Sequence, residues 1–364
     1  MKEEARIILM ADMNAFFASC HQSINPTLRN KPIIVGGSLT DKRKGLVIAC
    51  SYEAKRKGVY TTQSVYQARK CCPDAIFVQR DHSLYHSISS KIMEFLRLIG
   101  PTEVASIDEA YIDITERSSN GPHPIVIARY IQEKLWEKIH IPCSIGIGPN
   151  KIISKMASEV KKTQGIVQMG VKQFMTYYHP RPLNELYGCG AATEERLAKN
   201  GMKTIGDLAK ADLLVLRALL GKRGELLHQY ANGRSSSAVD EEREKGDKTI
   251  GKETTFNEDT ADSNIILGIA KQMVQRLSGR LQEKNKKART VSIVYKTERI
   301  GRSYTKSLTL SAPTHDASLI LQAARTLYLD HLNETPIRLF GIRLSNLDDT
   351  QYDQLSLLDL DLKY

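Results

Sequence analysis

Three carboxylates beside short apolar runs are the residues of this 364-residue chain whose types and spacing best suit chemistry. Asp12 follows the apolar run that begins at residue 6, and Asp108 and Glu109 lie where two further runs meet. Carboxylate oxygens are ligands that Mg²⁺ prefers, and a pair of Mg²⁺ ions can hold the attacking and leaving oxygens of a phosphoryl transfer. Taken singly, acidic residues at strand ends are mostly solvated turn residues, so spacing alone supports metal binding only as a hypothesis.

The elements that must position these carboxylates are alternating strands and helices. Apolar residues recur every three or four positions over 82–98 and over 124–139, which predicts two amphipathic helices. Short apolar runs at 102–107 and 110–114 predict two strands in direct succession, joined at Asp108 and Glu109. This order favours a split β-α-β sheet with a small insertion at about 16–78.

The charge of the chain indicates a polyanionic partner. It carries 52 Lys and Arg against 41 Asp and Glu, a formal net charge of +11, and nucleic acid is the first candidate. Residues 271–306 contain 11 Lys and Arg against 2 Asp and Glu, so most of the excess lies in one small module. The candidates for contact with DNA phosphates are Lys286, Lys287, Arg289, Lys296 and Arg302.

The sequence predicts a cytoplasmic location. No run approaches the 18 or so apolar residues that span a bilayer, and the charged start is unlike a secretory signal. The six cysteines are scattered and form no C-x-x-C pair, which is typical of reduced thiols inside the cell.

Two segments around the carboxylates resemble the signature segments of the Y-family DNA polymerases, the translesion enzymes, and most closely those of the bacterial DinB branch. They are residues 12–19 (Asp-Met-Asn-Ala-Phe-Phe-Ala-Ser) and 106–115 (Ser-Ile-Asp-Glu-Ala-Tyr-Ile-Asp-Ile-Thr). Residues 51–59 resemble the nucleotide-binding segment of the family's fingers, and residues 144–158 its last palm strand and following helix. The resemblance is collinear over about residues 6–347.

The resemblance implies an α+β multidomain fold arranged as a right-hand polymerase. The expected parts are a ferredoxin-like palm (1–15 and 79–168), small fingers (16–78), a helix-hairpin-helix thumb (169–233), a linker (234–246), a C-terminal α/β little-finger domain that binds DNA (247–347) and a tail (348–364). We expect the protein to be a monomer.

The resemblance also implies roles at the active site. Asp12, Asp108 and Glu109 are expected to be catalytic and to hold two Mg²⁺ ions, with the Met13 carbonyl as a further ligand. Phe17 is expected to be the steric gate, a ring packed against C2′ of the incoming sugar that excludes a ribose hydroxyl. The residues expected to bind the nucleotide are Ala15, Phe16, Phe17, Tyr52, Lys55, Arg56 and Lys162. Without the resemblance, Phe16 and Phe17 would be interpreted as core aromatics.

The sequence departs from the family pattern at three places near this site. Lys55 stands where the family usually has Arg, so we expect a weaker grip on the triphosphate or a contact from Arg56 instead. Thr163-Gln164-Gly165 replaces the usual Pro-Asn-Gly, and Thr61-Thr62-Gln63 replaces a Ser-Gly-Met-like segment near the templating base. These departures concern lesion range and base preference rather than the chemistry.

Two short motifs point to DNA and to a partner protein. Gly188-Cys189-Gly190 before a predicted helix resembles a helix-hairpin-helix, in which Gly188 and Gly190 let the backbone approach a phosphate, and residues 220–224 resemble a second copy. Near the end, Gln354, Leu355, Leu357 and Leu358 resemble the motif by which bacterial polymerases dock on the β sliding clamp. Alone, the first string is also typical of a turn and the second of an acidic-apolar tail.

Together these features predict an error-prone, template-directed DNA polymerase for translesion synthesis that adds dNTPs to a primer 3′ end without proofreading. The expected partners are primer-template DNA, dNTPs and the β sliding clamp. Two alternatives stay open at this point: a catalytically inactive, clamp-associated DNA-binding accessory protein, and a two-metal nucleotidyl cyclase on a similar sheet. A cyclase needs no thumb and no basic C-terminal module, and the intact Asp12, Asp108 and Glu109 argue against an inactive protein.

Overall fold

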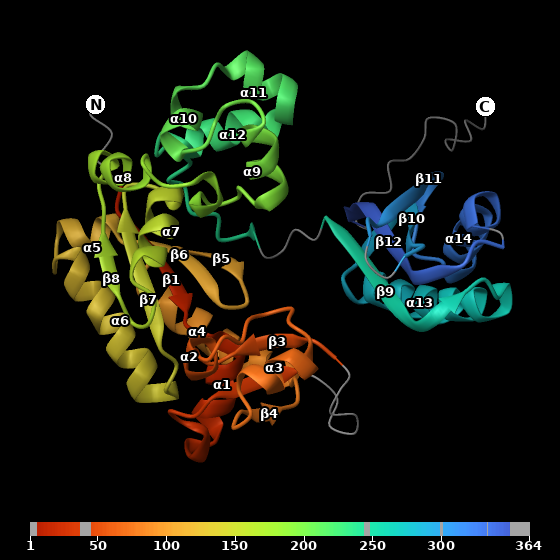
Figure 1. The fold of residues 1–364 in the computed structure, drawn as a ribbon, viewed down its shortest axis with the longest axis horizontal. Coiled ribbons are helices and arrows are strands. Elements are labelled where there is room, and N and C mark those ends of the chain that lie inside the picture. Colours follow the sequence, from red (N-terminus) through yellow and green to blue (C-terminus); the bar gives the residue numbers. More distant parts are fainter. Residues whose placement is uncertain (1–5, 37–44, 244–247, 299–300, 333, 350–364) are drawn as a thin grey trace, which may run out of the picture. The chain divides into compact units, whose positions relative to one another are not determined.

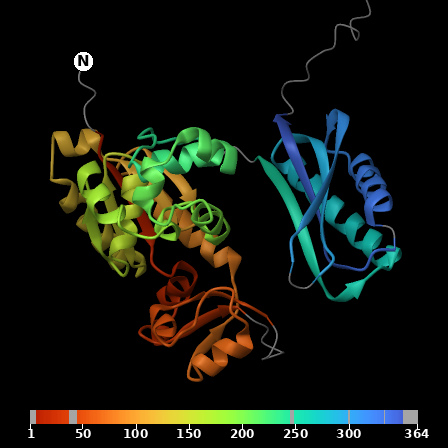
Figure 2. The same ribbon diagram turned by 45° about the horizontal axis from the view of Figure 1, so that its top comes forward.

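The three carboxylates lie in the first of two units, Met1–Glu244 and Lys245–Tyr364, into which the chain divides in this computed structural model. The structure describes residues 6–36, 45–243, 248–298, 301–332 and 334–349. Each unit has its own β-structure, as Figures 1 and 2 show. Each also has its own hydrophobic core.

A five-stranded sheet with the order β5-β6-β1-β7-β8 forms the centre of the first unit. Its strands are β1 (Ile8–Met13), β5 (Thr102–Ser106), β6 (Glu109–Asp113), β7 (Cys143–Gly148) and β8 (Ile166–Gln168). β1 is buried along its whole length and pairs antiparallel with β6 and β7, so Asp12 lies opposite Glu109 on one side and Ser144 on the other. The predicted strands are confirmed, with β1 extending through Asp12 to Met13.

Helices cover both faces of this sheet (Figure 1). On one face, α4 (His82–Arg97) and α6 (Pro124–Ile139) pack against Leu9, Ala11 and Ile145 in one core cluster, which confirms the two predicted amphipathic helices. On the other face, α7 (Lys151–Val160) lies against β7 and β1. The short helix α5 (Thr115–Ser119) follows β6.

α7 approaches β7 closely because glycines face it. A Cβ atom on Gly146 would lie 1.9 Å from the carbonyl oxygen of Ser154 and 2.4 Å from the amide nitrogen of Ser158. No side chain fits in that space, so the helix backbone rests directly on the strand. This contact fixes the height of α7 above the carboxylates of the neighbouring strands.

The segment between β1 and α4 forms a small three-stranded sheet with helices. Its elements are α1 (Phe16–Ile24), the 3₁₀ turn η1 (Pro26–Leu28), β2 (Ile33–Gly36), β3 (Val47–Cys50), α2 (Tyr52–Arg56), α3 (Val65–Cys71) and β4 (Ile76–Val78). The strand order is β3-β2-β4, with a core of its own around Ile34, Val47 and Ala68. Ser51 caps the start of α2 by accepting a hydrogen bond from the Ala54 N–H, which sets the first turn that carries Tyr52.

Short helices follow the five-stranded sheet. They are α8 (Val171–Tyr178), the 3₁₀ turn η2 (Leu183–Glu185), α9 (Ala191–Ala198), α10 (Ile205–Lys210), α11 (Leu213–Leu220) and α12 (Lys222–Ala231). Their core includes Ile153 and Met156 of α7 together with Phe174 and Leu216. α7 is therefore shared between the sheet and these helices, and it links their positions.

The predicted linker is fastened to the first unit over its described residues. The Ser235 hydroxyl accepts a hydrogen bond from the Ile152 N–H at the start of α7 (3.0 Å). Further along, the carboxylate of Glu103 in β5, which is 1% exposed, accepts from the Asp240 N–H (2.8 Å) and pairs with Lys151 and Arg243. The polar residues of this segment therefore anchor it to the first unit.

A four-stranded antiparallel sheet with the order β11-β10-β12-β9 forms the second unit. Its elements are β9 (Thr249–Thr260), α13 (Ser263–Glu283), β10 (Lys286–Lys296), β11 (Tyr304–Thr314), α14 (Ala317–Leu332) and β12 (Ile337–Asp349). Both helices lie on one face of the sheet (Figure 2). The sequence analysis missed β9, a largely exposed edge strand whose polar residues carry no apolar alternation.

Among the helices that the structure describes, none has the length and apolar character needed to cross a bilayer.

Candidate active site

The predicted catalytic carboxylates line one cavity at the end of β1. Asp12 belongs to β1, Glu109 begins β6 opposite it, and Asp108 lies in the turn between β5 and β6. This turn is tied down because the Met13 N–H donates to the Asp108 carbonyl (2.9 Å) and the Ser106 hydroxyl donates to Oδ1 of Asp108 (2.6 Å). The cavity has a volume of about 330 Å³, and all three carboxylates contribute to its lining.

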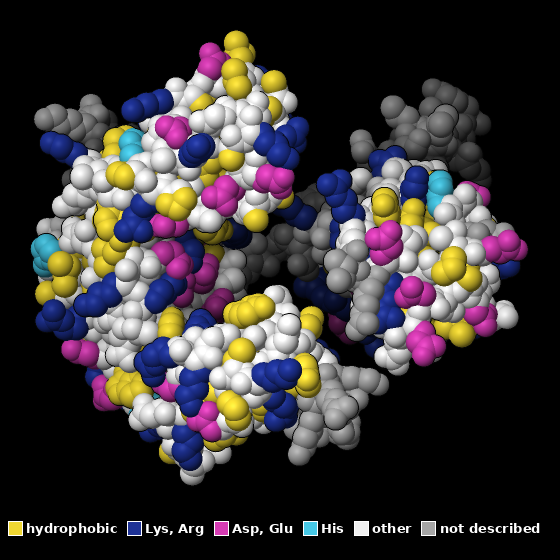
Figure 3. All heavy atoms as spheres, in the orientation of Figure 1, with side chains coloured by type: hydrophobic (Ala, Val, Ile, Leu, Met, Phe, Trp, Pro, Cys, Tyr) yellow, Lys and Arg dark blue, Asp and Glu magenta, His cyan; other side chains and the backbone are white. Residues whose placement is uncertain are grey.

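Two lysines that follow β7 in the chain reach into this cluster. The Nζ of Lys155 in α7 lies 2.9 Å from Oδ2 of Asp12, 2.9 Å from Oε1 of Glu109 and 2.8 Å from Oε1 of Glu159. The Nζ of Lys162 lies 2.7 Å from Oδ2 of Asp12 and 2.9 Å from Oε1 of Glu159. Acidic side chains gather in a hollow of the first unit in Figure 3, with Lys and Arg side chains around it.

Burial and neighbouring charges oppose one another in this cluster. Burial lowers the pKa of the Lys155 ammonium, but the carboxylates of Asp12 and Glu109 raise it by more, so this pKa lies above its ordinary value. Burial raises the pKa of Asp12, yet the ammoniums of Lys155 and Lys162 bring it below its ordinary value. At Glu109, burial and the charges of Asp12 and Asp108 outweigh Lys155, so the pKa is raised. Of Asp12 and Glu109, Glu109 is therefore the carboxylate that these lysines neutralise less.

The donor set of this cavity fits a divalent cation. Four carboxylates, those of Asp12, Asp108, Glu109 and Glu159, line it together with the ammonium of Lys162, and Lys155 contacts three of them from α7. The four negative charges exceed the three positive ones, those of Lys55, Lys155 and Lys162, and hard cations bound by oxygen ligands would neutralise the excess. Within the described residues, no three His, Cys, Asp or Glu side chains form a ready-made metal cluster, since the Lys155 ammonium lies between Asp12 and Glu109.

The ring of Phe17 lies in the wall of the same cavity and is held from behind. It stacks on the ring of Tyr85 from α4, with centroids 4.2 Å apart and planes 12° apart. Tyr85 is fully buried, and its hydroxyl lies 2.9 Å from Nε2 of His21. Sequence reasoning named Phe17 but missed Tyr85, which is one of several apolar positions of an ordinary amphipathic helix.

The residues predicted to bind the nucleotide divide into two groups in the structure. Ala15, Phe16, Phe17, Tyr52, Lys55 and Lys162 line the cavity of the carboxylates. Lys55 places its ammonium 4.6 Å from the Tyr52 ring centroid. Arg56 does not line this cavity; its guanidinium is largely exposed and lies 3.7 Å from Glu53. Burial, with the nearby charges of Asp12 and Glu159, raises the pKa of Tyr52 to about 12, so its hydroxyl stays protonated at neutral pH.

Asn14 is a further positioning residue that the sequence analysis did not single out. Its side-chain amide donates to Oγ of Ser144 (3.0 Å), and its Oδ1 accepts from the backbone N–H of Gln164 (2.9 Å). Thr163 and Gln164 have left-handed φ angles of 68° and 62°, which non-glycine residues adopt only when other contacts hold them. Asn14 therefore fixes the turn that follows Lys162. In the sequence, the one indication that this turn is unusual was the replacement of the usual Pro-Asn-Gly by Thr163-Gln164-Gly165.

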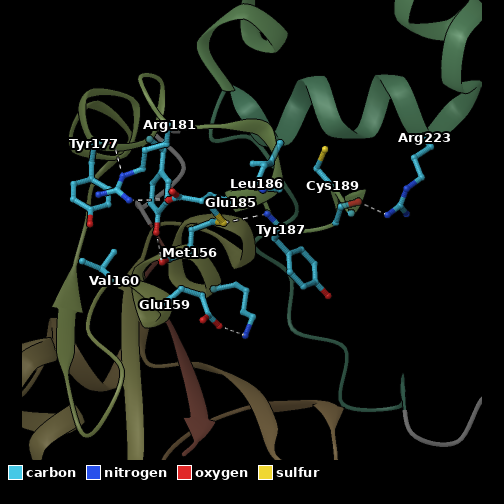
Figure 4. Close-up of a pocket in the computed structure, with 15 residues that line it drawn as sticks. Met156, Glu159, Val160, Tyr177, Arg181, Glu185, Leu186, Tyr187, Cys189 and Arg223 are labelled. Atoms are coloured by element: carbon cyan, nitrogen blue, oxygen red, sulfur yellow. Dashed lines mark hydrogen bonds and ion pairs between the residues drawn. The ribbon is translucent and has the colours of Figure 1, made fainter. Parts of the chain in front are cut away.

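The two predicted helix-hairpin-helix loops lie together. Gly188 has a φ of 86° and Gly190 precedes α9, while Gly221 has a φ of 62° and precedes α12. A terminal nitrogen of Arg223 donates to the Gly188 carbonyl (2.5 Å) and joins the two loops. Figure 4 shows the hollow beside them, which also contains Glu159 of α7. Glu159 of α7 lines both this hollow and the cavity of the carboxylates, so the loops border the candidate active site.

The basic residues of the second unit lie on β10 and the turn after it. Val291, Ile293 and Tyr295 pack toward the helices, and since side chains alternate along a strand, Ser292 and Lys296 face the other side of the sheet. Arg289 and Arg302 are exposed, whereas Lys286 and Lys287 are partly buried. The predicted clamp-binding residues Gln354, Leu355, Leu357 and Leu358 lie outside the described residues.

Comparisons with known proteins agree with this geometry. Residues 11–159 match the impB/mucB/samB family, residues 247–357 the C-terminal domain of that family, and residues 184–234 the thumb domain of DNA polymerase iota. The chain is 38% identical over 360 residues to DNA polymerase IV of Bacillus velezensis, covering 98% of this chain and 86% of that protein. It is 34% identical over 357 residues to DNA polymerase IV of Listeria monocytogenes, covering 98% of this chain and 99% of that protein.

A solved structure supports the same fold. A chimera of the Y-family DNA polymerases Dbh and Dpo4 superposes with a TM-score of 0.81 at 24% identity, covering 94% of this chain and 99% of that one. The chain therefore belongs to the Y family of translesion DNA polymerases, in its bacterial DinB branch. This membership carries DNA-directed DNA synthesis, a right-hand fold and dependence on a divalent metal.

Proposed function

We propose that the chain adds dNTPs to a primer 3′ end by two-metal phosphoryl transfer and releases pyrophosphate, with low fidelity and without proofreading. The observation that carries this proposal is the shared cavity in which Asp12, Asp108 and Glu109 meet Phe17, Tyr52 and Lys162. A metal-ligand cluster, a sugar-sized aromatic wall and a cationic phosphate contact are the parts that nucleotide addition requires.

The carboxylates and the Met13 carbonyl are the groups that would hold two Mg²⁺ ions. Such ions, when bound, neutralise charge on the phosphates and lower the pKa of the attacking hydroxyl. We assign Glu109 to the primer 3′-hydroxyl side, as the family resemblance implies, and burial with the charges of Asp12 and Asp108 raises the pKa of its carboxyl. Asp12 binds both Lys155 and Lys162, so it would hold its position while the ligands of the site change.

The triphosphate would be held by groups that line the cavity from three elements. Lys162 follows α7 and supplies a cation, and Lys55 of α2 supplies a second one from the other wall. Tyr52 can donate from its protonated hydroxyl. The backbone amides at the start of α1, after the left-handed Ala15, form a helix N-terminus suited to an anion. Lys55 is thus the triphosphate contact that the geometry favours, and Arg56 lies outside this cavity.

Phe17 would act as the steric gate, because its ring is fixed by Tyr85 and forms part of the cavity wall. A ribose 2′-hydroxyl in contact with this ring would be desolvated without a hydrogen-bond partner, which costs on the order of 1–3 kcal/mol before any steric clash is counted.

We also propose the domain assignments and partners expected from the sequence. Residues 1–15 and 79–168 would form the palm, 16–78 the fingers, 169–233 the thumb and 247–347 the little finger, with a linker at 234–246 and a tail at 348–364. The glycine loops of the thumb and the helix-free face of the four-stranded sheet would contact the DNA backbone. The remaining proposals are a β clamp contact through the tail, a monomeric state and a cytoplasmic location.

Primer extension on undamaged and lesion-bearing templates tests the proposed activity. Asp108→Asn should reduce extension by more than about a thousandfold, since removing one charge-stabilising group costs on the order of 4 kcal/mol. DNA binding should stay within about twofold of wild type, because Asp108 is not a DNA-backbone contact. Asp113→Asn, at the far end of the strand that follows Asp108 and outside the cavity, should extend primers normally. Normal extension by Asp108→Asn would refute the roles assigned here.

The inactive accessory protein and the nucleotidyl cyclase are not favoured by these findings. The family match covers the thumb and the C-terminal module as well as the sheet, and the catalytic carboxylates are intact.

A further inference from the structure

A second cavity lies next to the active site and has no part in the function proposed so far. It has a volume of about 280 Å³ and lies between α1, α2, the end of α6 and the turn at 163–164. Ala15 and Tyr52 line both this cavity and the cavity of the carboxylates. The two cavities therefore meet at these residues, at the end of the active site where the triphosphate would lie.

The lining of the second cavity is suited to a small anion. Arg29 and Arg56 both line it, against one carboxylate, Glu53, which lies 3.7 Å from Arg56. The Nε of Arg29 donates to the Gln22 carbonyl (3.3 Å), which leaves its two terminal nitrogens without a partner among the described residues. Guanidinium groups with free terminal nitrogens bind phosphate oxygens in pairs.

A buried polar atom in the lining also lacks a partner. His140 ends α6 with a left-handed φ of 53°, and its Nδ1 is buried without a hydrogen bond within the described part of the chain. Buried polar atoms are nearly always satisfied, so an atom left open beside a polar cavity points to a missing partner. The His140 ring packs edge-on against Trp136, with centroids 5.5 Å apart.

The size of the cavity restricts the ligand. Pockets that enclose drug-sized molecules measure about 300–1,000 Å³, so a volume of about 280 Å³ suits a small hydrated anion better than a whole nucleotide. The reaction proposed above produces such an anion directly beside this cavity, because each nucleotide addition breaks the bond between the α- and β-phosphates and releases pyrophosphate.

We propose that this second cavity is a product site, which receives pyrophosphate after it leaves the carboxylates and holds it on Arg29 and Arg56. The inference rests on the proposed function, because pyrophosphate is the product of that reaction. No bond forms or breaks at this site. It lowers the chance that pyrophosphate reverses the addition, since a diphosphate held beyond Tyr52 is removed from the primer end.

Trp136 makes the site directly observable, because it is the single tryptophan of the chain and lines this cavity but not the other. Titrating the full-length protein with sodium pyrophosphate should give a saturable change in tryptophan fluorescence. Inorganic phosphate should bind at least about tenfold more weakly, because it offers one phosphate group to two guanidiniums. Equal affinity for both anions would overturn the assignment to the product.

Two variants that each lose one positive charge test whether the fluorescence change comes from this cavity. Arg29→Gln should weaken pyrophosphate binding about tenfold, as expected for the loss of a charge-assisted hydrogen-bond pair. Arg129→Gln removes an exposed cation from the same helix as Trp136 without touching the cavity, and it should bind like wild type. Absence of a saturable signal in wild type, or equal affinity in Arg29→Gln and wild type, would refute the site.

Primer extension by the same proteins separates this inference from the proposed function. Arg29→Gln should extend primers at the wild-type rate when pyrophosphate is absent, since Arg29 does not line the cavity of the carboxylates. Added pyrophosphate should inhibit Arg29→Gln more strongly than wild type, because the variant no longer holds the product away from the primer end. A protein that shows the fluorescence change but does not extend primers would refute the polymerase mechanism, and with it the origin of the ligand. Normal extension without any fluorescence change would refute the second site alone.

Discussion

The two sheets of this polymerase carry charge in opposite ways. At the end of the five-stranded sheet, charged side chains converge below the surface: Lys155 is 6% exposed and contacts three carboxylates. On the four-stranded sheet, cations such as Arg289 and Arg302 are exposed and spread along the strand and turn. The first arrangement depends on backbone placement to within tenths of an ångström, whereas the second depends on the sum of many weak contacts. Single changes should therefore be severe in the first sheet and mild in the second.

The largest effect is expected at Gly146, where the five-stranded sheet meets α7. The added methyl of Gly146→Ala would lie 1.9 Å from the Ser154 carbonyl, so α7 must move and take Lys155 and Glu159 with it. We expect a loss of about 3 kcal/mol or more in unfolding free energy and loss of primer extension, measured by denaturant titration and single-turnover kinetics. Gly268→Ala in α13, where the methyl meets open space, should be neutral or slightly stabilising. Equal stabilities of the two variants would show that α7 tolerates displacement.

The next effect concerns the sugar-facing wall. Phe17→Ala removes the ring that Tyr85 holds, and the ratio of kcat/KM for dNTP over rNTP should fall by about a hundredfold, or about 2.7 kcal/mol. Phe95→Ala removes a ring from α4 away from the cavity and should keep the wild-type ratio. Unchanged sugar selection in Phe17→Ala would refute the steric-gate role of Phe17.

A smaller effect is expected at the anchor of the linker, and it depends on pH. Burial raises the pKa of Glu103, but its bonds to Lys151, the Asp240 N–H and Arg243 bring the pKa below its ordinary value of 4.5. The stabilisation from this carboxylate is therefore present above that value and is lost as the pH falls through the lowered pKa. Glu103→Gln should cost about 1–3 kcal/mol of unfolding free energy at pH 7, and its difference from wild type should shrink on acidification toward pH 3. A difference that stays constant from pH 7 to pH 3 would contradict this anchor.

The smallest effect is expected on the four-stranded sheet. Lys296→Gln should weaken DNA binding by less than about 1 kcal/mol and reduce the slope of log K against log salt by about one, as for loss of a single phosphate contact. Lys271→Gln, on α13 at the opposite face of the sheet, should leave that slope unchanged. A loss of a hundredfold in affinity from Lys296→Gln would mean that the second sheet, too, concentrates its binding energy in one residue.

Most of the fold could be predicted from the sequence, as could the three carboxylates that line one cavity. Strands with apolar runs and helices with clear periodicity, such as α4 and α6, are encoded locally, so their positions were predicted to within a few residues. The meeting of Asp12 with Glu109 followed from two strands that end in acids and from the family resemblance. β9 was not predicted, because an exposed edge strand needs no apolar alternation.

The supporting residues of the site could not be predicted in this way. Asn14 bonds to Ser144 and Gln164, partners more than a hundred positions away, and Tyr85 supports Phe17 from a different helix. Such pairs follow from tertiary packing, and neither spacing nor residue type distinguishes them from ordinary buried polar and aromatic residues. The position of Arg56 could not be predicted either, because Arg56 lines the second cavity while its neighbour Lys55 lines the cavity of the carboxylates.

The stack of Phe17 on Tyr85 has a consequence for how the enzyme treats its substrates. If Phe17 is the proposed steric gate, its barrier exists before any nucleotide arrives and is the same for every base, because protein atoms alone hold the ring. Tolerance toward a damaged template can then be wide without weakening the distinction between deoxyribose and ribose. Such an enzyme can insert wrong bases and still incorporate only deoxyribonucleotides.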